Sequence, residues 1–278
     1  MRVTIFGASG LLGKALMGEW REATVSGLTS RDADLREPQA VQRAVRETGP
    51  DWIVLSAAYT DVDGCESNRD LAFAVNRDGA VNVAVAAREA GARLLFLSSD
   101  YVFDGSKRTP YEIDDVRNPQ SVYGTSKAEA EVRLLELMPA CCIVRTSWLF
   151  GAGGKCFPDT ILKLAETRPT LNVVDDQRGC PTYVVDLARA IVQLCRKNSA
   201  GIVHVTNAGN CTWFDFAEQI VKQSERKTNV LPVSSEQMAR PAPRPAYSVL
   251  SPARLQALGI EMPSWADALR RYLEQRQG

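Results

Sequence analysis

The sequence predicts an α/β fold, in which a doubly wound parallel Rossmann-type sheet carries a smaller, interleaved C-terminal substrate lobe. Short apolar runs alternate with helical patterns through the first half of the chain, as in a parallel sheet covered on both faces. The first strand, 2–6, opens directly into a glycine-rich turn. The 278 residues suffice for a sizeable core, in one large domain or two closely joined parts.

The apolar runs in the first half are mostly continuous, which is typical of strands buried on both faces. They predict strands at 2–6, 24–28, 52–56, 93–98 and 141–146, with helices between them at 10–20, 37–48, 68–90 and 121–137. Asp63 and Glu66 have the spacing of a capping box, which predicts a helix start or turn after the strand 52–56.

The second half of the chain is less regular. A flexible loop at 151–154 precedes a predicted helix at 158–167, and a final amphipathic helix is expected at 264–275. The helix 183–197 and the strand 202–206 read as a return to the main sheet, whereas three prolines exclude regular structure from 240–245. We therefore expect a dinucleotide-binding domain at 1–150, its sheet completed by 183–207, and a mainly substrate-binding lobe at 151–278.

The charge balance excludes several classes of partner. The 33 basic residues equal the 33 acidic ones, so nothing indicates nucleic acid or a membrane surface, and an anionic substrate must be bound by local groups. The strand at residue 2 leaves no room for a signal peptide. Seven cysteines without a CxxC pair and a single histidine, His204, predict reduced thiols and no metal site. We expect a cytoplasmic monomer or homodimer.

The turn Gly7-x-x-Gly10-x-x-Gly13 has the properties of a dinucleotide site. Its glycines allow a tight turn and close approach of the backbone to a diphosphate, and the following helix N-terminus supplies N–H donors. The spacing differs by one residue from GxGxxG. The alternative is a glycine-rich turn without a ligand, which the position after the first strand makes the weaker reading.

The strand 24–28 ends without the acidic residue that binds a ribose 2′-hydroxyl, and Arg31 follows two hydroxyl side chains there. A guanidinium suits a 2′-phosphate, so we expect NADPH with NADH also accepted; the alternative is that Arg31 is a solvated loop charge. Asp34 and Leu35 could meet the adenine edge. The segment after the strand 52–56, which includes Ala58, Tyr59 and Thr60, lies at the carboxyl edge where open sheets bind ligands.

A candidate reacting centre lies at Tyr123 and Lys127, which are four residues apart and share one helix face. A free phenol has a pKa near ~10, and a nearby ammonium lowers such a pKa by roughly 1–3 units. We expect Tyr123 to donate a proton to a substrate carbonyl and Ser99, at the end of the strand 93–98, to stabilise the developing oxyanion. Lys127 would bind the nicotinamide ribose. Alone, the pair would indicate only a surface helix.

Other polar and aromatic residues allow two interpretations. Trp148 follows the strand 141–146 and could pack in the core or face a sugar. Arg244 could pair with a diphosphate or stay solvated. His204 is expected to be a strand residue with a satisfied ring rather than a catalyst.

These motifs also resemble the extended short-chain dehydrogenase/reductase family, and more narrowly its dTDP-4-dehydrorhamnose reductase branch. The resemblance runs nearly end to end, through GASGLLG, SAAYTDVDGCE, VNRDGAVNVA, SSDYVFDG, YGTSKAEAE, VRTSWLFG, DDQRGCPT and RPAYSVLS. It implies Ser99, Tyr123 and Lys127 as the catalytic set and substrate contacts at Ser99, Asp100 and Trp148. It implies cofactor contacts at Gly10, Leu11, Leu12, Asp34, Leu35, Ala58, Tyr59 and Thr60.

The resemblance implies reduction of the 4-keto group of dTDP-4-dehydro-β-L-rhamnose by hydride from NADPH or NADH. The alternatives are another nucleotide-sugar 4-ketoreductase or epimerase, or a non-catalytic regulatory subunit similar to the beta subunit of methionine adenosyltransferase. Some relatives dimerise through magnesium held by carboxylates, one of them early in the first helix. This chain has Gly13-Lys14-Ala15 there, which leaves a role for magnesium open.

Overall fold

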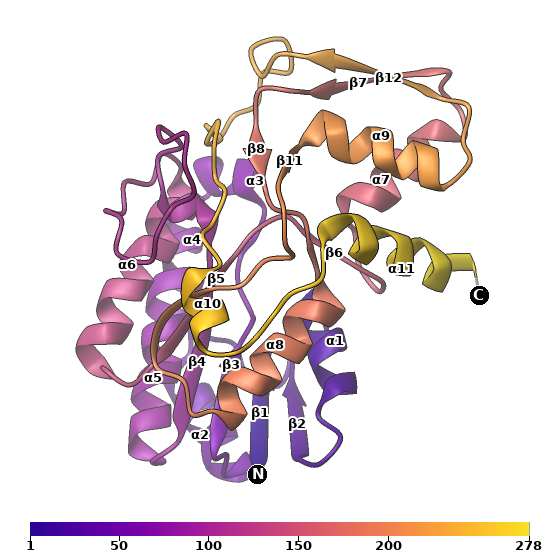
Figure 1. Ribbon diagram of the computed structural model, residues 1–278. Coiled ribbons are helices and arrows are strands. Elements are labelled where there is room, and N and C mark those ends of the chain that lie inside the picture. Colours follow the sequence, from indigo (N-terminus) through magenta and orange to yellow (C-terminus); the bar gives the residue numbers. More distant parts are fainter. Residues whose placement is uncertain (278) are drawn as a thin grey trace.

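A six-stranded parallel sheet forms the centre of the computed structural model, which describes residues 1–277 (Figure 1). Its strand order is β10-β5-β4-β3-β1-β2, and each neighbouring pair is parallel. The strands are β1 (Arg2–Phe6), β2 (Thr24–Leu28), β3 (Trp52–Leu55), β4 (Arg93–Ser99), β5 (Cys142–Thr146) and β10 (Gly201–His204). The return of the chain to this sheet through β10 agrees with the sequence prediction.

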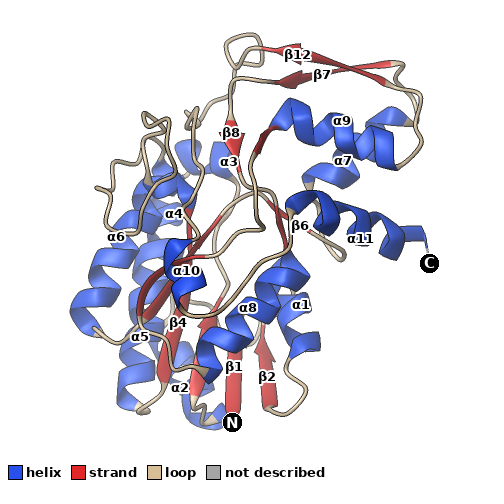
Figure 2. Ribbon diagram, viewed as in Figure 1, coloured by secondary structure: helices blue, strands red, loops and turns tan. Residues whose placement is uncertain are grey.

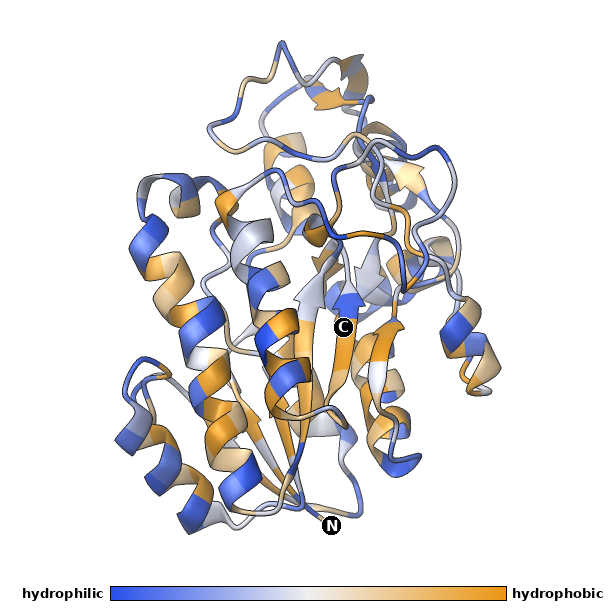
Figure 3. Ribbon diagram, turned by 90° about the vertical axis from the view of Figure 1, so that its left-hand side faces the viewer, coloured by the Kyte–Doolittle hydropathy of each residue, from blue (hydrophilic) through white to orange (hydrophobic). Residues whose placement is uncertain are grey.

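Helices cover both faces of the sheet (Figure 2). Successive side chains of a strand point to opposite faces, so Val3 and Ile5 join one hydrophobic cluster and Phe6 joins the other. The first face is covered by α1 (Leu11–Glu19), α8 (Val184–Arg196) and α10 (Ala253–Ala257), and the second by α2 (Pro38–Thr48), α5 (Gly79–Glu89) and α6 (Val122–Leu137). The strands are accordingly mostly hydrophobic along their length (Figure 3).

The segment between β3 and β4 differs from the single helix expected at 68–90. It comprises α3 (Val62–Ser67), α4 (Arg69–Phe73), a π-helical turn η1 (Ala74–Asp78) and α5. The π turn places the buried Asn76 side chain toward the loop that follows β3. The predicted capping box was wrong in its residues: Asp61 caps α3 by accepting from the Gly64 amide, while Asp63 and Glu66 bind elsewhere.

The second half builds a smaller lobe beside the carboxyl edge of the sheet, at the upper right of Figure 1. It contains α7 (Phe157–Ala165), α9 (Trp213–Gln223), α11 (Trp265–Gln277) and a parallel pair of strands, β7 (Thr170–Val174) and β12 (Asn229–Val233). Two short ladders lead into it: β6 (Leu149–Phe150) with β9 (Thr182–Tyr183), and β8 (Arg178–Gly179) with β11 (Cys211–Thr212). A separate aromatic-rich cluster forms its core.

The remaining predicted strands and helices lie within two residues of their observed bounds, and 240–245 is irregular as predicted. The sequence did not predict β6 to β9, β11, β12, α9 or α10. The two-residue strands β6, β8, β9 and β11 are too short to show a periodic apolar pattern, whereas α9 is amphipathic, with Phe216, Ala217, Ile220 and Val221 on its buried face, and this signal was missed. Within the described residues, no helix is both long and apolar enough to span a membrane.

We expect the packing of α1 on the sheet to be a major contribution to stability. Leu16 is fully buried between α1 and the first sheet face, so Leu16→Ala should lower the free energy of unfolding by about 2–5 kcal/mol. Its neighbour Met17 is 41% exposed, and Met17→Ala should change the free energy of unfolding by less than about 1 kcal/mol. Urea denaturation of both variants tests this, and equal losses would contradict the assignment of α1 to the core.

Candidate active site

The carboxyl edge of the sheet contains two adjoining hollows. The chain turns to opposite sides after β1, to β2 on one side and β3 on the other, and a crevice opens where such a reversal occurs. The main hollow has a volume of about 630 Å³ and is lined by the segments after β1, β3, β4 and β5. The side hollow, of about 370 Å³, lies between the ends of β1, β2 and β3 and shares Gly7, Ser30, Ala57 and Ala58 with it.

The glycine turn after β1 has no room for side chains at two of its positions. Gly7 has φ +93°, and a Cβ there would lie 2.6 Å from the Ala57 amide nitrogen. A Cβ at Gly13 would lie 2.0 Å from the Gly7 carbonyl oxygen. Gly10 is the N-cap of α1 and provides no side-chain cap, so the first amides of α1 remain available at the hollow. The turn therefore fits a dinucleotide diphosphate. Leu11 and Leu12 line the hollow beside it.

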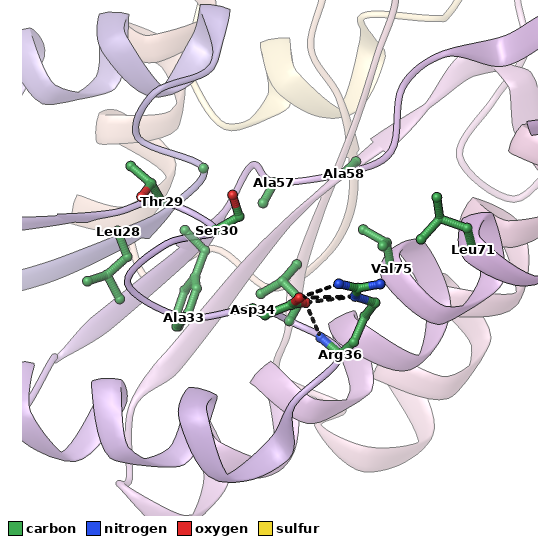
Figure 4. A pocket seen from close by; sticks show the side chains of 13 residues that line it. Leu28, Thr29, Ser30, Ala33, Asp34, Arg36, Ala57, Ala58, Leu71 and Val75 are labelled. Carbon is green, nitrogen blue, oxygen red and sulfur yellow. Dashed lines mark hydrogen bonds and ion pairs between the residues drawn. The ribbon is translucent and has the colours of Figure 1, made fainter. Parts of the chain in front are cut away.

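The side hollow contains Asp34 and Leu35, as the sequence predicted, together with a cation that it missed (Figure 4). Arg36 binds Asp34 through two nitrogens, with Nε 3.0 Å from Oδ1 and Nη2 2.5 Å from Oδ2. These hydrogen bonds hold the pKa of Asp34 below its usual value. The predicted phosphate ligand Arg31 is exposed and is not among the lining residues.

Asn76 fixes the loop after β3, in which Ala58 and Thr60 line the main hollow. Its side chain accepts from the Tyr59 amide at 2.7 Å and donates to the Tyr59 carbonyl at 3.1 Å. It also donates to the Ser126 hydroxyl on α6 at 3.0 Å. Tyr59 itself is therefore a backbone anchor, and its side chain does not line either hollow. The π turn at a ligand-facing loop agrees with the frequent occurrence of such turns at functional sites.

Ser99, Tyr123 and Lys127 all line the main hollow. Ser121 caps α6 by accepting from the Gly124 amide, so the helix begins just before Tyr123 and presents it on the face that carries Lys127. The helix packs closely on the end of β4, since a Cβ at Gly124 would lie 2.2 Å from the Tyr101 carbonyl oxygen. The structure thus brings the three predicted catalytic side chains to one hollow.

The expected lowering of the Tyr123 pKa by Lys127 was wrong. Burial and the negative charge of Asp100 raise the pKa of Tyr123 above its usual value, opposed by a hydrogen bond with Ser99. Burial lowers the pKa of Lys127 to about 7. Desolvation is the largest cause of both shifts, because burial disfavours the charged form of each group. The phenol consequently stays protonated at neutral pH and can serve as a proton donor.

Asp100 lies at the same edge and is almost fully buried. The Ser99 hydroxyl donates to Asp100 Oδ1 at 2.9 Å and accepts from the Tyr101 amide at 3.2 Å. Burial raises the pKa of Asp100 to about 6, opposed by hydrogen bonds from Ser248 and Ser99. Asp100 therefore orients the Ser99 hydroxyl beside Tyr123.

Trp148 lines the main hollow and is also packed against a second aromatic ring. Its ring stacks on Trp213 of α9 with 3.6 Å between centroids, and both rings line the hollow. Trp148 has φ +49°, a strained conformation for a bulky residue. A Cβ at Gly179 would lie 2.6 Å from the Trp148 ring, so only glycine fits behind it.

Arg244 is ion-paired within the protein and not solvated. Its guanidinium binds Asp63 at 3.0 and 3.1 Å, and it does not line either hollow. The pair connects the irregular segment 240–245 to α3. His204 is buried in β10 with Nε2 3.4 Å from Arg145 Nη1, and burial lowers the pKa of its ring to about 3.

Sequence reasoning missed Arg36, Asn76, Trp213 and Lys155 as residues of the site. Lys155 lines the main hollow beside Gly10 and Leu11, and a cation directly after the glycine loop 151–154 was a usable signal for it. Asn76 and Trp213 gave no such signal, since their positions depend on the π turn and on the lobe. In the part of the chain that the structure describes, no cluster of three metal-binding side chains occurs.

Comparisons with known proteins agree with this geometry. The model of the family described as RmlD substrate binding domain matches residues 1–277. The chain is 40% identical to the spore coat polysaccharide biosynthesis protein SpsK of Bacillus subtilis, covering 99% of this chain and 98% of that one. It is 41% identical to a dTDP-4-dehydrorhamnose reductase of Streptomyces griseus, covering 96% of this chain and 91% of that one.

A solved structure of the dTDP-4-dehydrorhamnose reductase from Bacillus anthracis, in complex with NADP, superposes with a TM-score of 0.96. The two chains are 41% identical, and the match covers 99% of each. The arrangement of sheet and lobe described above is therefore that of a solved reductase structure.

We expect Asn76→Ala to loosen the loop after β3, because the backbone N–H and C=O of Tyr59 both lose their partner. The free energy of unfolding should fall by about 1–3 kcal/mol, and the Tyr59 amide should exchange its hydrogen faster. Ser126→Ala, which removes only the third contact of Asn76, is the matched control. An unchanged Tyr59 exchange rate in Asn76→Ala would contradict the anchoring role.

Proposed function

This chain belongs to the RmlD substrate binding domain family, and from that premise we propose that it reduces the 4-keto group of dTDP-4-dehydro-β-L-rhamnose to give dTDP-L-rhamnose. The proposal is supported most directly by the position of Ser99, Tyr123 and Lys127 in one hollow beside a glycine turn. The activity named for relatives at about 40% identity over nearly the whole chain points to the same reaction.

NADPH is the proposed cofactor, with NADH also accepted. The α1 amides beyond Gly10 would hold its diphosphate, and the side hollow, with Asp34 and Leu35, would hold its adenosine. The bound nicotinamide supplies the hydride. Lys127, buried and facing the main hollow, is the group proposed to bind the nicotinamide ribose. The NADP in the Bacillus anthracis structure supports this choice.

The catalytic step that we propose uses the phenol of Tyr123 as the proton donor. Reduction of the ketone leaves negative charge on its oxygen, to which the Tyr123 O–H transfers its proton. The raised pKa of Tyr123 keeps that proton in place until charge develops on the substrate. The Ser99 O–H, which donates to Asp100 in the ligand-free protein, would turn its single proton to the same oxygen and stabilise it before the transfer.

The substrate is proposed to lie between the sheet edge and the lobe formed mainly by 151–278. Asp100 and Trp148 would contact the sugar, with Trp148 offering an apolar ring face. Lys155, on the same hollow, supplies a local cation for a chain without net charge. The protein is expected to act as a monomer or homodimer.

Incubation with the 4-keto-L-sugar nucleotide and NADPH is the direct test of the proposed function. We expect stoichiometric loss of absorbance at the reduced nicotinamide band and formation of dTDP-L-rhamnose. An epimerase would interconvert sugars with no net change in absorbance. A regulatory subunit would give no turnover at all, and either result would overturn the proposal.

We expect Tyr123→Phe to reduce kcat by about 10²–10⁴-fold, because it removes the proton donor alone. The Kd for NADPH, measured by fluorescence titration, should change little. Tyr111→Phe is the matched control, since Tyr111 lies outside both hollows and binds Asp104. Full turnover in Tyr123→Phe would disprove the proton-donor role.

Arg31 is exposed and directly follows Ser30, which lines the side hollow, so we expect Arg31→Ala to raise KM for NADPH about tenfold more than KM for NADH, because only NADPH carries the 2′-phosphate. Arg36→Ala should act in the same direction, since it leaves the Asp34 carboxylate unneutralised in the side hollow. Arg43→Ala, an exposed position on α2, serves as the control. Equal effects on both cofactors would contradict the phosphate assignment of Arg31.

A further inference from the structure

Lys127 and Glu131 have the spacing of an ion pair on α6 but do not form one. Residues four apart on a helix are neighbours, and both side chains are almost fully buried. No ion pair joins Lys127 Nζ to Glu131, which pairs with Arg117 and Arg145 instead. Lys127 Nζ lies over the face of the Phe96 ring, 4.0 Å from the ring centroid. An ammonium with no anionic partner is therefore left facing the main hollow.

Glu131 is occupied by other partners on both of its oxygens. Arg145 of β5 binds it through Nε at 2.9 Å and Nη2 at 2.7 Å. Arg117 binds Oε2 through Nε at 2.6 Å, and the Ser98 hydroxyl donates to Oε1 at 2.5 Å. Arg145 is fully buried, and it has no contact with the hollow itself. These four bonds occupy both carboxylate oxygens, while the negative charge of Glu131 still opposes the lowering of the Lys127 pKa by burial.

We propose that Arg145, with Arg117 and Ser98, withholds Glu131 from Lys127 and so keeps the Lys127 ammonium free to bind a ligand in the main hollow. Arg145 is then a positioning residue that acts through Glu131. The inference rests on the proposed function for its role in turnover, but its structural part concerns only the chain. Were Lys127 paired with Glu131, its ammonium would have to break that pair before it could bind a ribose hydroxyl.

Other titratable groups near Lys127 do not take the place of Glu131. On α6 itself, Tyr123 stays protonated, and Glu129 pairs outward with Arg77 of η1, which also binds Asp78. After β4, Asp100 binds Ser99, and Tyr101 is neutral because burial raises its pKa.

The titratable groups of α3 also have partners or are neutral. Asp63 pairs with Arg244, and Glu66 accepts a hydrogen bond from the Val122 amide. Cys65 stays protonated because burial raises the pKa of its thiol. Arg69 of α4 packs over Phe73, and Lys155 lies across the hollow.

The experiment measures the titration of Lys127 directly, by NMR of protein labelled at the lysine Cε carbon, with Lys127→Arg to assign the signal. Burial sets this pKa at about 7 in the native protein, opposed by Glu131. In Arg145→Met the freed Glu131 should pair with Lys127 and shift the titration upward by about 1 unit. In Glu131→Gln the titration should shift downward. Arg145→Lys, which retains a cation for Glu131, should stay close to the native value.

The double variant Glu131→Gln/Arg145→Met decides whether the effect passes through Glu131. We expect the upward shift of Arg145→Met to vanish in the Glu131→Gln background. A shift that persists there would come from the charge of Arg145 alone and would overturn the proposal. Should Arg145→Met fail to fold, Arg117→Met provides the same cycle, because its side chain is 27% exposed. A smaller upward shift is then expected, and no shift would overturn the proposal.

Turnover gives a second readout. The alkaline limb of the pH profile of kcat/KM should move with the Lys127 titration, upward in Arg145→Met and downward in Glu131→Gln. Opposite shifts in the two variants cannot arise from a general loss of stability. A protein without reductase activity would overturn the proposed function. The NMR titration needs no substrate, so it would still test whether Arg145 keeps Glu131 from pairing with Lys127.

Discussion

The close packing of β1 against β3 is the constraint on which the rest of the site depends. Gly7 and Gly13 must remain glycines because a Cβ at Gly7 would collide with the Ala57 backbone, and a Cβ at Gly13 would collide with the Gly7 carbonyl oxygen. This turn orients α1, whose N-terminus then faces the main hollow at the carboxyl edge of the sheet. Since the sheet is parallel, the segments after β3, β4 and β5 that line the main hollow lie at the same edge.

Burial shifts the pKa values of Tyr123 and Lys127 on α6 in opposite directions, and both shifts suit carbonyl reduction. It keeps Tyr123 protonated, and it brings the pKa of Lys127 close to neutrality. A phenol that is a poor acid in isolation becomes an effective donor when negative charge appears on the adjacent substrate oxygen, because that charge lies in the same water-poor hollow. The ion-pair cluster around Glu131 lies directly behind this face and fixes α6 to β4 and β5. Breaking such a buried pair costs about 3–5 kcal/mol, so the cluster is also a strong constraint on the position of the helix.

The smaller lobe is held to the sheet domain by a few specific contacts. Stacking of Trp148 on Trp213 joins the segment after β5 to α9, and Gly179 provides the space for it. The Asp63–Arg244 pair joins α3 to the irregular segment 240–245. The stacked rings of Trp148 and Trp213 line the main hollow, so the position of the lobe sets the shape of the proposed substrate site.

The sequence by itself determined the parallel sheet, its helices, the glycine turn and the three predicted catalytic residues. Those features follow from local patterns: continuous apolar runs, glycine spacing, and two side chains four apart on one helix. Only the tertiary structure decided the state of Tyr123, the pairing of Arg244 with Asp63, and the inclusion of Arg36, Asn76 and Trp213 in the site. The physical reason is that burial and pairing depend on which distant segments meet, and desolvation in the hollow outweighed the local attraction between phenolate and ammonium that spacing alone suggested.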